Sequence, residues 1–325
     1  MTAETATPRS AQARWRARTG PPLSAYGVYV ALLLLVVVNV VVTPSFLSAA
    51  NLRLQLVQTV PVLVVALGMA LVIGTEGIDL SVGSVMAIAA ALIPLYLGYG
   101  AATAIVVSLV AGAAAGLLSG SLVTFAGIQP IVATLALLIG GRGLAIVIAH
   151  GQLKQIYNPQ LLALGSDNVA GVPLTVLVAA VLVVAVGLLV GRTTFGRQLV
   201  AVGGNRKAAE FAGLPVRRVL LVVYMLSGVL AAVAGVLATA RLNSSDPSNL
   251  GQLIELSAIT AVVVGGTPLS GGRVRVVGTV AGALLMQLIT ATLIAHNVPA
   301  SVTQMVEAAI IAVAVLLQRE GRAGA

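Results

Sequence analysis

Residues 191–219 read GRTTFGRQLVAVGGNRKAAEFAGLPVRRV and separate two long hydrophobic parts of the chain. The segment holds six of the 18 basic residues and a single acid, Glu210. Those six are Arg192, Arg197, Arg206, Lys207, Arg217 and Arg218. Because lysine and arginine resist transfer across a bilayer, basic residues beside membrane spans accumulate in cytoplasmic loops. We therefore predict a membrane protein whose loop at 191–219 lies in the cytoplasm.

The same loop carries the start and stop signals of a short helix over residues 201–213. Asn205 is suited to the N-cap position before RKAAEFA, and Gly213 is suited to ending the helix ahead of Pro215. A loop that served only to orient the spans would not need these caps, although charge alone is compatible with that role. The caps favour an element that docks onto a cytoplasmic partner.

The composition of the whole chain is that of a membrane protein. Mean hydropathy is +1.08, 59% of residues are hydrophobic and only 8% are charged. A span needs about 20 apolar residues, so 325 residues can hold roughly ten spans. The net charge of +9 is placed at span ends rather than along one face, so no nucleic-acid partner is expected. The chain has no cysteine and only two isolated histidines, so no metal site is predicted either.

We predict an all-α polytopic membrane protein of about ten transmembrane helices. The expected spans are 26–42, 57–73, 82–97, 102–125, a fifth ending near Ala149, 174–190, 220–240, 253–264, 276–295 and 301–317. They form a transmembrane domain at 26–317, between cytoplasmic tails at 1–25 and 318–325. An even count puts every basic cluster and both termini on the cytoplasmic side. Five spans on each side of the midpoint would allow an inverted 5+5 repeat, and a short echo links GIDLSVGSV (77–85) with TPLSGGRVR (267–275).

Residues 74–84, GTEGIDLSVGS, interrupt the apolar pattern with Glu76 and Asp79 among glycines. Non-helical backbone at membrane depth persists only when it is buried in protein or lines a cavity. Asp79 with Ser81 also reads as the N-terminus of the following helix. Two interpretations stay open, a capped structural loop and a part of a translocation path.

A few polar side chains fall inside the expected spans. They are Asn39, Arg142, Gln287, Gln304 and Glu307. At about 1.5 Å of rise per residue, Arg142 and Glu307 lie roughly 10 Å and 9 Å from the outer ends of their spans. Similar depth allows a buried ion pair between Arg142 and Glu307, which would be structural more often than catalytic.

Signatures of an enzyme are missing from the sequence. It has no GxxxxGK[ST] phosphate loop and no HExxH motif, and neither Lys154 nor Lys207 follows a glycine-rich turn. An ion-coupled carrier working alone needs ion-handling groups at the midplane, and few are present. A basic docking loop without its own nucleotide motif favours a transport subunit that a separate ATPase energises.

Motifs along residues 50–317 resemble the permease subunit of bacterial ATP-binding-cassette (ABC) sugar importers of the ribose/xylose/galactose type. The motifs, in order, are GIDLSVGS (77–84), IQP (128–130), ATL (133–135), Arg142-Gly143, TFGR (194–197), AVGGN (201–205), Ala208-Ala209, Gly213, Tyr224, LSG (226–228), Glu255-Leu256, GGT (265–267) and LSGGR (269–273). The resemblance implies a multi-pass protein of the bacterial inner membrane. It also implies a monosaccharide as cargo and no cofactor of its own, since ATP is bound by the partner subunit.

The resemblance implies three protein partners besides membrane lipid. These are a cytoplasmic ABC ATPase, an external sugar-binding protein, and a second permease, either another copy or a paralogue. It further implies that the segment from Gly203 to Gly213 contacts the ATPase. The coupling residues would be Gly203, Gly204, Asn205, Arg206, Lys207, Ala208, Ala209, Phe211 and Gly213.

Candidates for the translocation path or its gate are drawn from the polar residues of the spans and interruptions. They are Glu76, Asp79, Ser81, Gln129, Arg142, Glu255, Gln304 and Glu307. Glu76 stands where the similar permeases commonly have glycine, and Glu307 where many have a basic residue. A permease for branched-chain amino acids or nucleosides is the alternative within transport, and the sugar-type GIDLSVGS run speaks against it.

Overall fold

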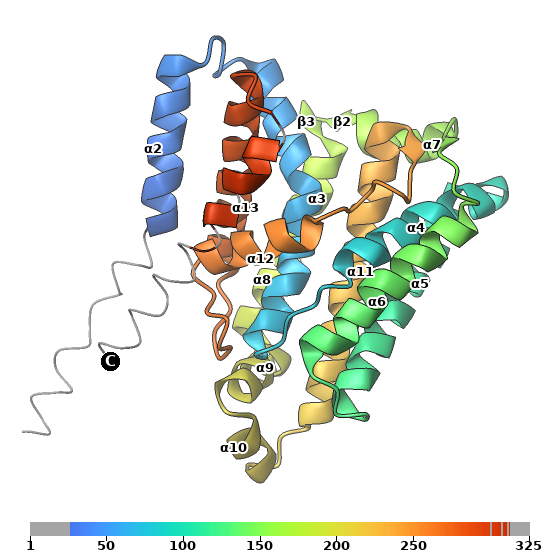
Figure 1. The fold of residues 1–325 in the computed structure, drawn as a ribbon, viewed down its shortest axis with the longest axis vertical. Coiled ribbons are helices and arrows are strands. Elements are labelled where there is room, and N and C mark those ends of the chain that lie inside the picture. Colours follow the sequence, from blue (N-terminus) through green and yellow to red (C-terminus); the bar gives the residue numbers. More distant parts are fainter. Residues whose placement is uncertain (1–26, 300, 307, 311, 313–325) are drawn as a thin grey trace, which may run out of the picture.

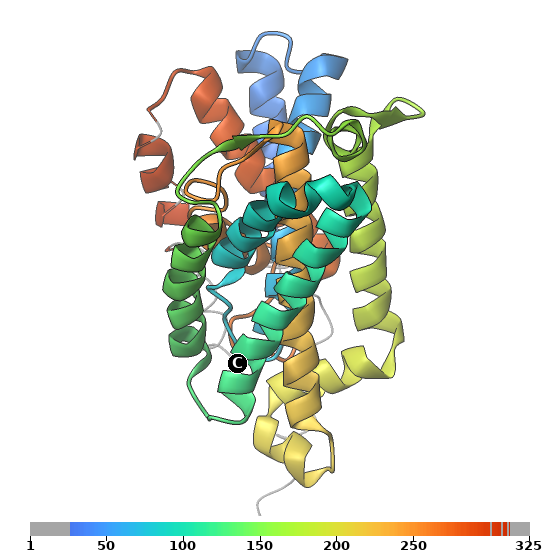
Figure 2. The ribbon, with the colours of Figure 1, turned by 90° about the vertical axis from the view of Figure 1, so that its right-hand side faces the viewer.

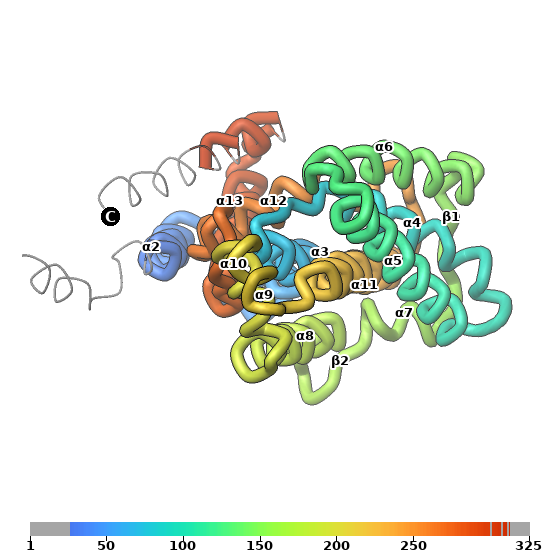
Figure 3. Tube along the Cα trace, turned by 90° about the horizontal axis from the view of Figure 1, so that it is seen from below, coloured from blue at the N-terminus to red at the C-terminus, as the bar shows by residue number. Residues whose placement is uncertain are grey.

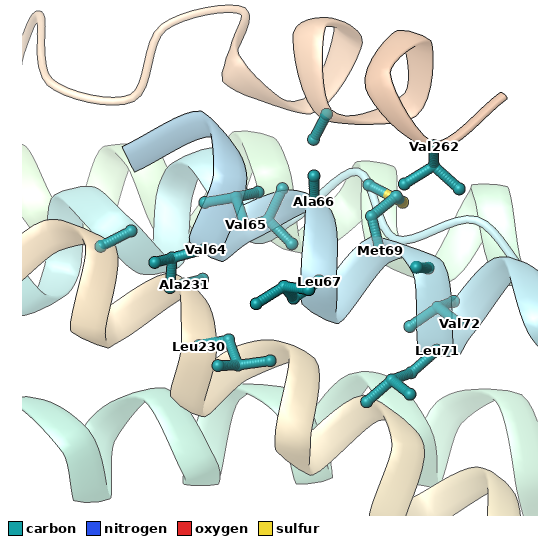
Figure 4. Close-up of a cluster of buried hydrophobic side chains, with 14 of the residues drawn as sticks. Val64, Val65, Ala66, Leu67, Met69, Leu71, Val72, Leu230, Ala231 and Val262 are labelled. Atoms are coloured by element: carbon teal, nitrogen blue, oxygen red, sulfur yellow. The ribbon is translucent and has the colours of Figure 1, made fainter. Parts of the chain in front are cut away.

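The computed structural model describes residues 27–299, 301–306, 308–310 and 312. Two long helices form its centre, α3 (Ala49–Gly74) and α11 (Val216–Leu242), which pack against each other (Figure 1). Every residue from Leu63 to Gly74 is buried, as expected for a helix that is hydrophobic all round. Figure 4 shows Leu67 of α3 beside Leu230 and Ala231 of α11 in this core.

The other apolar helices surround this pair. They are α2 (Gly27–Val42), α4 (Val82–Tyr96) with the short η2 (Leu97–Tyr99), α5 (Ala101–Thr124), α6 (Pro130–Ile148), α8 (Leu174–Arg192), α12 (Ile254–Val264) and α13 (Val276–Ala295). Helix α5 runs along α11, and α4 packs against both α5 and α6. On the other side of α3 lie α12 and α13, and α2 covers α13. Seen from below in Figure 3, α6 and α8 flank the central pair on opposite sides.

Short elements close the two ends of the bundle. At the end shown at the top of Figure 1 lie α7 (Pro159–Ser166) and the β2–β3 hairpin, in which β2 (Asn168–Val169) pairs with β3 (Val172–Pro173). Strand β1 (Lys154–Gln155) pairs antiparallel with β4 (Ser244–Ser245). The opposite end carries α9 (Thr194–Gly204) and α10 (Arg206–Phe211), so we call it the α10 end.

Small residues bring α5 and α11 together. A β-carbon added at Gly116 would meet the carbonyl oxygen of Tyr224, and one added at Gly228 would meet that of Gly112. In lipid no hydrophobic force drives helices together, so close backbone packing of this kind supplies the association. Glycines at these positions therefore allow α5 and α11 to pack closely.

The outer faces of the bundle are apolar and exposed. Large hydrophobic side chains project from them, among them Val110, Ile139, Val147, Val181 and Leu188. In α6 and in α8, only 17% of the most apolar 18-residue stretch is buried inside the chain. A surface of this kind is suited to lipid or to another membrane chain.

Most of the expected spans match helices of the structure, with some corrections. Among the described residues, seven helices are long and apolar enough to cross a membrane, and α2 and α12 are shorter apolar helices. Helix α3 begins at Ala49, so residues 49–56, expected outside the span, belong to it. The expected loop at 150–173 contains the helix α7. Residues 301–306, 308–310 and 312 are helical, but residues 307, 311 and 313–317 of the expected tenth span lie outside the described residues, so the count of ten stays a prediction.

Candidate functional site

The segment at 193–214 folds into two capped helices. The Thr193 side chain accepts a hydrogen bond from the Gly196 amide at 3.1 Å and starts α9. The Asn205 carboxamide oxygen accepts one from the Ala208 amide at 3.0 Å and starts α10. Gly213 has φ +76° behind α10, a conformation that glycine adopts without steric cost. The prediction of an Asn205 cap and a Gly213 stop is confirmed.

The prediction of a single helix over residues 201–213 is wrong. Residues 201–204 belong to α9, which begins at Thr194, and α10 covers only Arg206–Phe211. The extended backbone of Asn205, at φ −162° and ψ +101°, separates the two helices because its side chain takes the cap position. The loop is therefore an angled helix pair.

Helix α10 stands at the edge of the molecule, beyond the bundle (Figures 1 and 2). Ala209 is buried on its inner face, whereas Lys207 and Ala208 are exposed. Phe211 is 92% exposed, the largest exposed fraction of any large hydrophobic side chain in the described residues. Arg206 pairs with Glu210 at 3.6 Å within the same helix turn. The outer face of α10 thus presents an exposed aromatic ring among charged side chains.

Behind α9 three segments meet at glycines. Gly203, the penultimate residue of α9, is buried against the carbonyl of Gly74, where α3 ends. The Gly272 amide donates a hydrogen bond to that carbonyl at 3.0 Å. Gly271, with φ +71°, lies beside both Gly203 and Glu76. The α10 end therefore holds a junction of α9, α3 and the 265–275 loop, which we call the glycine junction (Gly74, Gly203, Gly271 and Gly272).

From the glycine junction the chain runs back into the bundle through residues 75–81. Asp79 is 1% exposed, and its carboxylate accepts bonds from the Ser81 amide at 3.0 Å, the Ser81 hydroxyl at 2.6 Å and the Ser227 hydroxyl at 2.8 Å. Ser227 lies eleven residues into α11, roughly 16 Å from its start, so Asp79 sits near mid-depth. Irregular backbone at this depth is buried in protein, as the physics of lipid requires.

The predicted helix start at Asp79 and Ser81 is present, with the roles of the two residues divided. Ser81 occupies the N-cap position of α4 but makes no side-chain cap bond. The Asp79 carboxylate instead accepts hydrogen bonds from the Ser81 amide and hydroxyl, immediately before the helix. Both residues are enclosed, which fits a capped structural loop.

A second interruption lies between α11 and α12, at residues 243–253, which we call the strap. Nη1 of Arg142 donates hydrogen bonds to two strap carbonyls, to Pro247 at 2.9 Å and to Leu250 at 2.6 Å. The arginine therefore holds the strap against α6. Glu255, at the start of α12, is close enough to Arg142 for an electrostatic interaction.

The two interruptions converge in the bundle. A β-carbon at Gly83, in the first turn of α4, would lie 2.6 Å from Glu255 Oε2 and would meet the carbonyl of Gly251 in the strap. Helix α12 has 11 residues and is about 16 Å long, about half of a hydrocarbon core. Short helices that begin within the bilayer are typical of transporter sites. These two interruptions bring together four of the residues predicted for the translocation path: Asp79, Ser81, Arg142 and Glu255.

The remaining predicted path residues lie elsewhere. Glu76 is exposed at φ +66° and lines a cavity of about 230 Å³ together with Arg206 and Tyr224. Gln129 is exposed at the N-cap of α6, and Gln304 is exposed. The side chain of Glu307 lies outside the described residues, so the Arg142–Glu307 pair stays a prediction, and the contacts found for Arg142 are the strap carbonyls.

Several residues of these sites were not singled out from the sequence for the roles they have. Ser227 binds Asp79, the strap carbonyls bind Arg142, and Gly74 receives Gly203. The GG pairs at 203–204 and 271–272 were the available signal, because paired glycines often mark close approach of backbones. Within the described residues no three histidine, aspartate or glutamate side chains gather to hold a metal ion.

Known proteins resemble this chain over most of its length. It is 37% identical to the galactofuranose transporter permease protein YtfT of Escherichia coli K12, over 98% of this chain and 94% of that protein. It is also 37% identical to the fructose import permease protein FruF of Bifidobacterium longum, over 89% and 86%, and to the ribose import permease protein RbsC of Bacillus subtilis, over 90% and 92%. No solved structure matches the chain. The model of the family described as "branched-chain amino acid transport system / permease component" matches residues 51–315, and the chain belongs to this family of membrane permeases.

Proposed function

We propose that this protein is the permease subunit of an ABC importer and forms the translocation path for a monosaccharide. The observation that carries the proposal is α10, a short helix capped at both ends that leaves Phe211 92% exposed beyond the spans. Such a helix is suited to a groove in a cytoplasmic ATPase, with Phe211 at the centre and charges at the rim. The relatives named for ribose, fructose and galactofuranose import support a monosaccharide as the cargo.

The energy source lies in the partner, because the sequence has no phosphate-binding loop of its own. A sugar-binding protein delivers cargo at the end that carries α7 and the strap, and the ATPase docks at the α10 end. A second permease, identical or paralogous, completes the path. The exposed apolar faces of α6 and α8 supply surface for that partner and for lipid.

The architecture supports an inverted repeat of five spans. Helices α3 and α11 are each followed by an irregular segment and then by a helix that begins inside the bundle, α4 and α12 respectively. The echo between GIDLSVGSV and TPLSGGRVR does not mark this repeat, because the first follows α3 whereas the second follows α12. The repeat therefore rests on the order of helices.

Uptake into proteoliposomes that contain the permease, its ATPase and its binding protein tests the function and separates it from the amino-acid alternative. We expect ATP-dependent accumulation of a radiolabelled sugar from a panel of ribose, fructose and galactose, and none of leucine. Accumulation of leucine alone would favour the branched-chain amino-acid alternative. Uptake by the permease without its ATPase, driven by an ion gradient, would indicate an ion-coupled carrier.

Reversing the charge of Arg206 and Lys207 together is expected to weaken ATPase docking about tenfold or more. Both side chains are exposed on α10, so the bundle should fold normally. The measurement is the amount of ATPase that copurifies with a fixed amount of permease. Lys154→Glu, a charge reversal at the opposite end, is the matched control and should leave copurification unchanged. Full copurification of the Arg206→Glu, Lys207→Glu variant would remove the docking role of these two residues.

Gly213→Val is expected to distort the end of α10. At φ +76° a β-branched residue costs about 1 kcal/mol or more. The variant should reach the membrane in normal amount and retain less ATPase than Gly191→Ala, in which the new methyl group has nothing within 4 Å. Equal retention by the two variants would contradict a docking role for the shape of this turn.

Both termini are proposed to be cytoplasmic. A reporter enzyme that is active only outside the cytoplasm, fused after Ala325, should stay inactive. Activity there would contradict the proposed even number of spans. A fusion within the segment between α7 and α8, at Gly171, serves as the positive control because that segment lies at the opposite end from α10.

A further inference from the structure

At Gly203 the contact between α9 and α3 is made by backbone atoms, beside the buried Leu199 side chain of α9. A β-carbon at Gly203 would meet the carbonyl oxygen of Gly74, and would lie 2.7 Å from the Gly272 amide nitrogen. Real β-carbons do not approach backbone atoms so closely, so no other residue fits without moving α9 away from α3. The neighbouring Gly204 is exposed and would place its β-carbon in open space. The requirement for glycine is therefore specific to position 203.

The third side of the junction is equally tight. Gly271, at φ +71°, would place a β-carbon 2.7 Å from the Gly203 carbonyl oxygen and 2.8 Å from the Glu76 amide nitrogen. The Gly272 amide donates to the Gly74 carbonyl at 3.0 Å, which fixes the 265–275 loop to the end of α3. Contacts between backbones have little freedom to adjust, whereas long side chains can change rotamer.

The junction connects the docking segment to the interior of the bundle. On one side, α9 joins α10 through Asn205 alone. On the other side, residues 75–81 lead from Gly74 through Asp79 to the start of α4, and the Asp79 carboxylate accepts a hydrogen bond from Ser227 of α11. A displacement of α10 therefore has a route to the end of α3 and the 75–81 segment through backbone contacts at Gly203, Gly74 and Gly271.

We propose that Gly203 is a positioning residue, and that its backbone contact with Gly74 and Gly271 transmits motion of the ATPase-docking helices to α3 and residues 75–81. This inference rests on the proposed ABC permease function. It adds a site of transmission that is separate from the docking surface around Phe211. The resemblance places Gly203 among the residues that contact the ATPase, but it is buried in the glycine junction and not on the outer face of α10. Gly203 should therefore be dispensable for recruiting the ATPase and required for the response of the bundle to nucleotide.

The test compares Gly203→Ala and Gly271→Ala with Gly191→Ala, which adds the same methyl group in the last turn of α8 where nothing lies within 4 Å. Gly271→Ala leaves the sequence of α9 and α10 intact, so it perturbs the junction from the other side. Each variant is purified with its ATPase. Amide hydrogen exchange of residues 75–81 is then measured without nucleotide and with ATP trapped by vanadate.

In the unsubstituted complex and in Gly191→Ala we expect trapped ATP to change this exchange about threefold or more, a measurable shift in local opening. In Gly203→Ala and Gly271→Ala we expect normal copurification of the ATPase and loss of most of that change. A full response in both junction variants would overturn the proposal, and so would the absence of any response in the unsubstituted complex. Loss of ATPase from both junction variants would also overturn it, because the junction would then serve docking.

Failure of the proposed function looks different. If the unsubstituted chain recruits no ABC ATPase at all, the permease function fails before the junction is tested. If it recruits the ATPase and responds to nucleotide, the function stands, and the comparison between positions 203 and 191 decides the transmission role.

Discussion

Replacing Arg142 with methionine is expected to speed amide hydrogen exchange across the strap, residues 243–253, by about 100-fold. Nη1 of Arg142 donates to the carbonyls of Pro247 at 2.9 Å and Leu250 at 2.6 Å. Hydrogen bonds to charged groups contribute about 1.5–3 kcal/mol each, so losing both weakens the closed strap by about 3 kcal/mol. Each 1.4 kcal/mol is a tenfold change in the opening equilibrium that exchange reports.

The size of this effect follows from the position of the strap. It joins α11 to α12, and its Pro247 and Leu250 are buried, so a carbonyl there that loses its arginine has few other partners. Gly251 of the strap lies against Gly83 of α4, and Glu255 begins α12 beside it. Releasing the strap would therefore disturb the point at which the two interrupted regions meet, and we also expect sugar uptake to fall.

Arg53→Met is the matched control, because Arg53 is an exposed arginine near the start of α3. It should leave exchange of the strap unchanged. Arg142→Lys should give an intermediate result, since a single ammonium group lacks the fixed fork of a guanidinium. Unchanged exchange in Arg142→Met would show that the strap is held by its other contacts.

The sequence predicted best those features that neighbouring residues determine. Asn205 starts α10 and Gly213 follows its end, and both do so through hydrogen bonds to residues a few positions away in the chain. The apolar runs predicted most helix positions for the same reason. What was missed is α9, the helix before Asn205, because residues 201–204 were assigned to the helix that Asn205 begins, whereas they are the last residues of α9. Local propensity indicated a helix and did not fix how many there are.

Contacts between distant residues could not be predicted in this way. Depth in the membrane suggested Glu307 as the partner of Arg142, but depth gives only height along a span and leaves its rotation and neighbours open. The bonds found for Arg142 go to carbonyls more than 100 residues away in the sequence. Any residue can supply a backbone carbonyl, so the sequence does not show that the strap carbonyls bind Arg142. The same holds for the contact between Gly203 and Gly74, of which the sequence shows only that both residues are glycine.

Asp79→Ala is expected to give the largest loss of stability of any single change outside the glycine contacts. The carboxylate is 1% exposed and accepts three hydrogen bonds, two from Ser81 and one from Ser227 of α11. Alanine would leave these buried donors without an acceptor at about 1–3 kcal/mol each, so we expect a loss of at least about 3 kcal/mol in the free energy of unfolding. The start of α4 and its attachment to α11 would weaken together.

Thermal unfolding in detergent measures this loss, and related variants divide it. Ser227→Ala removes only the bond to α11 and should cost about 1 kcal/mol. Asp79→Asn keeps the shape but turns an amide donor toward one of the serine hydroxyls. Its effect should not add to that of Ser227→Ala, because the two residues contact each other. Ser119→Ala removes a buried hydroxyl that has no hydrogen-bond partner among the described residues, and it should be neutral or slightly stabilising. If Asp79→Ala melted at the same temperature as Ser119→Ala, the carboxylate would not be the link between α4 and α11, and the interpretation of residues 75–81 as a lining of the path would gain the advantage.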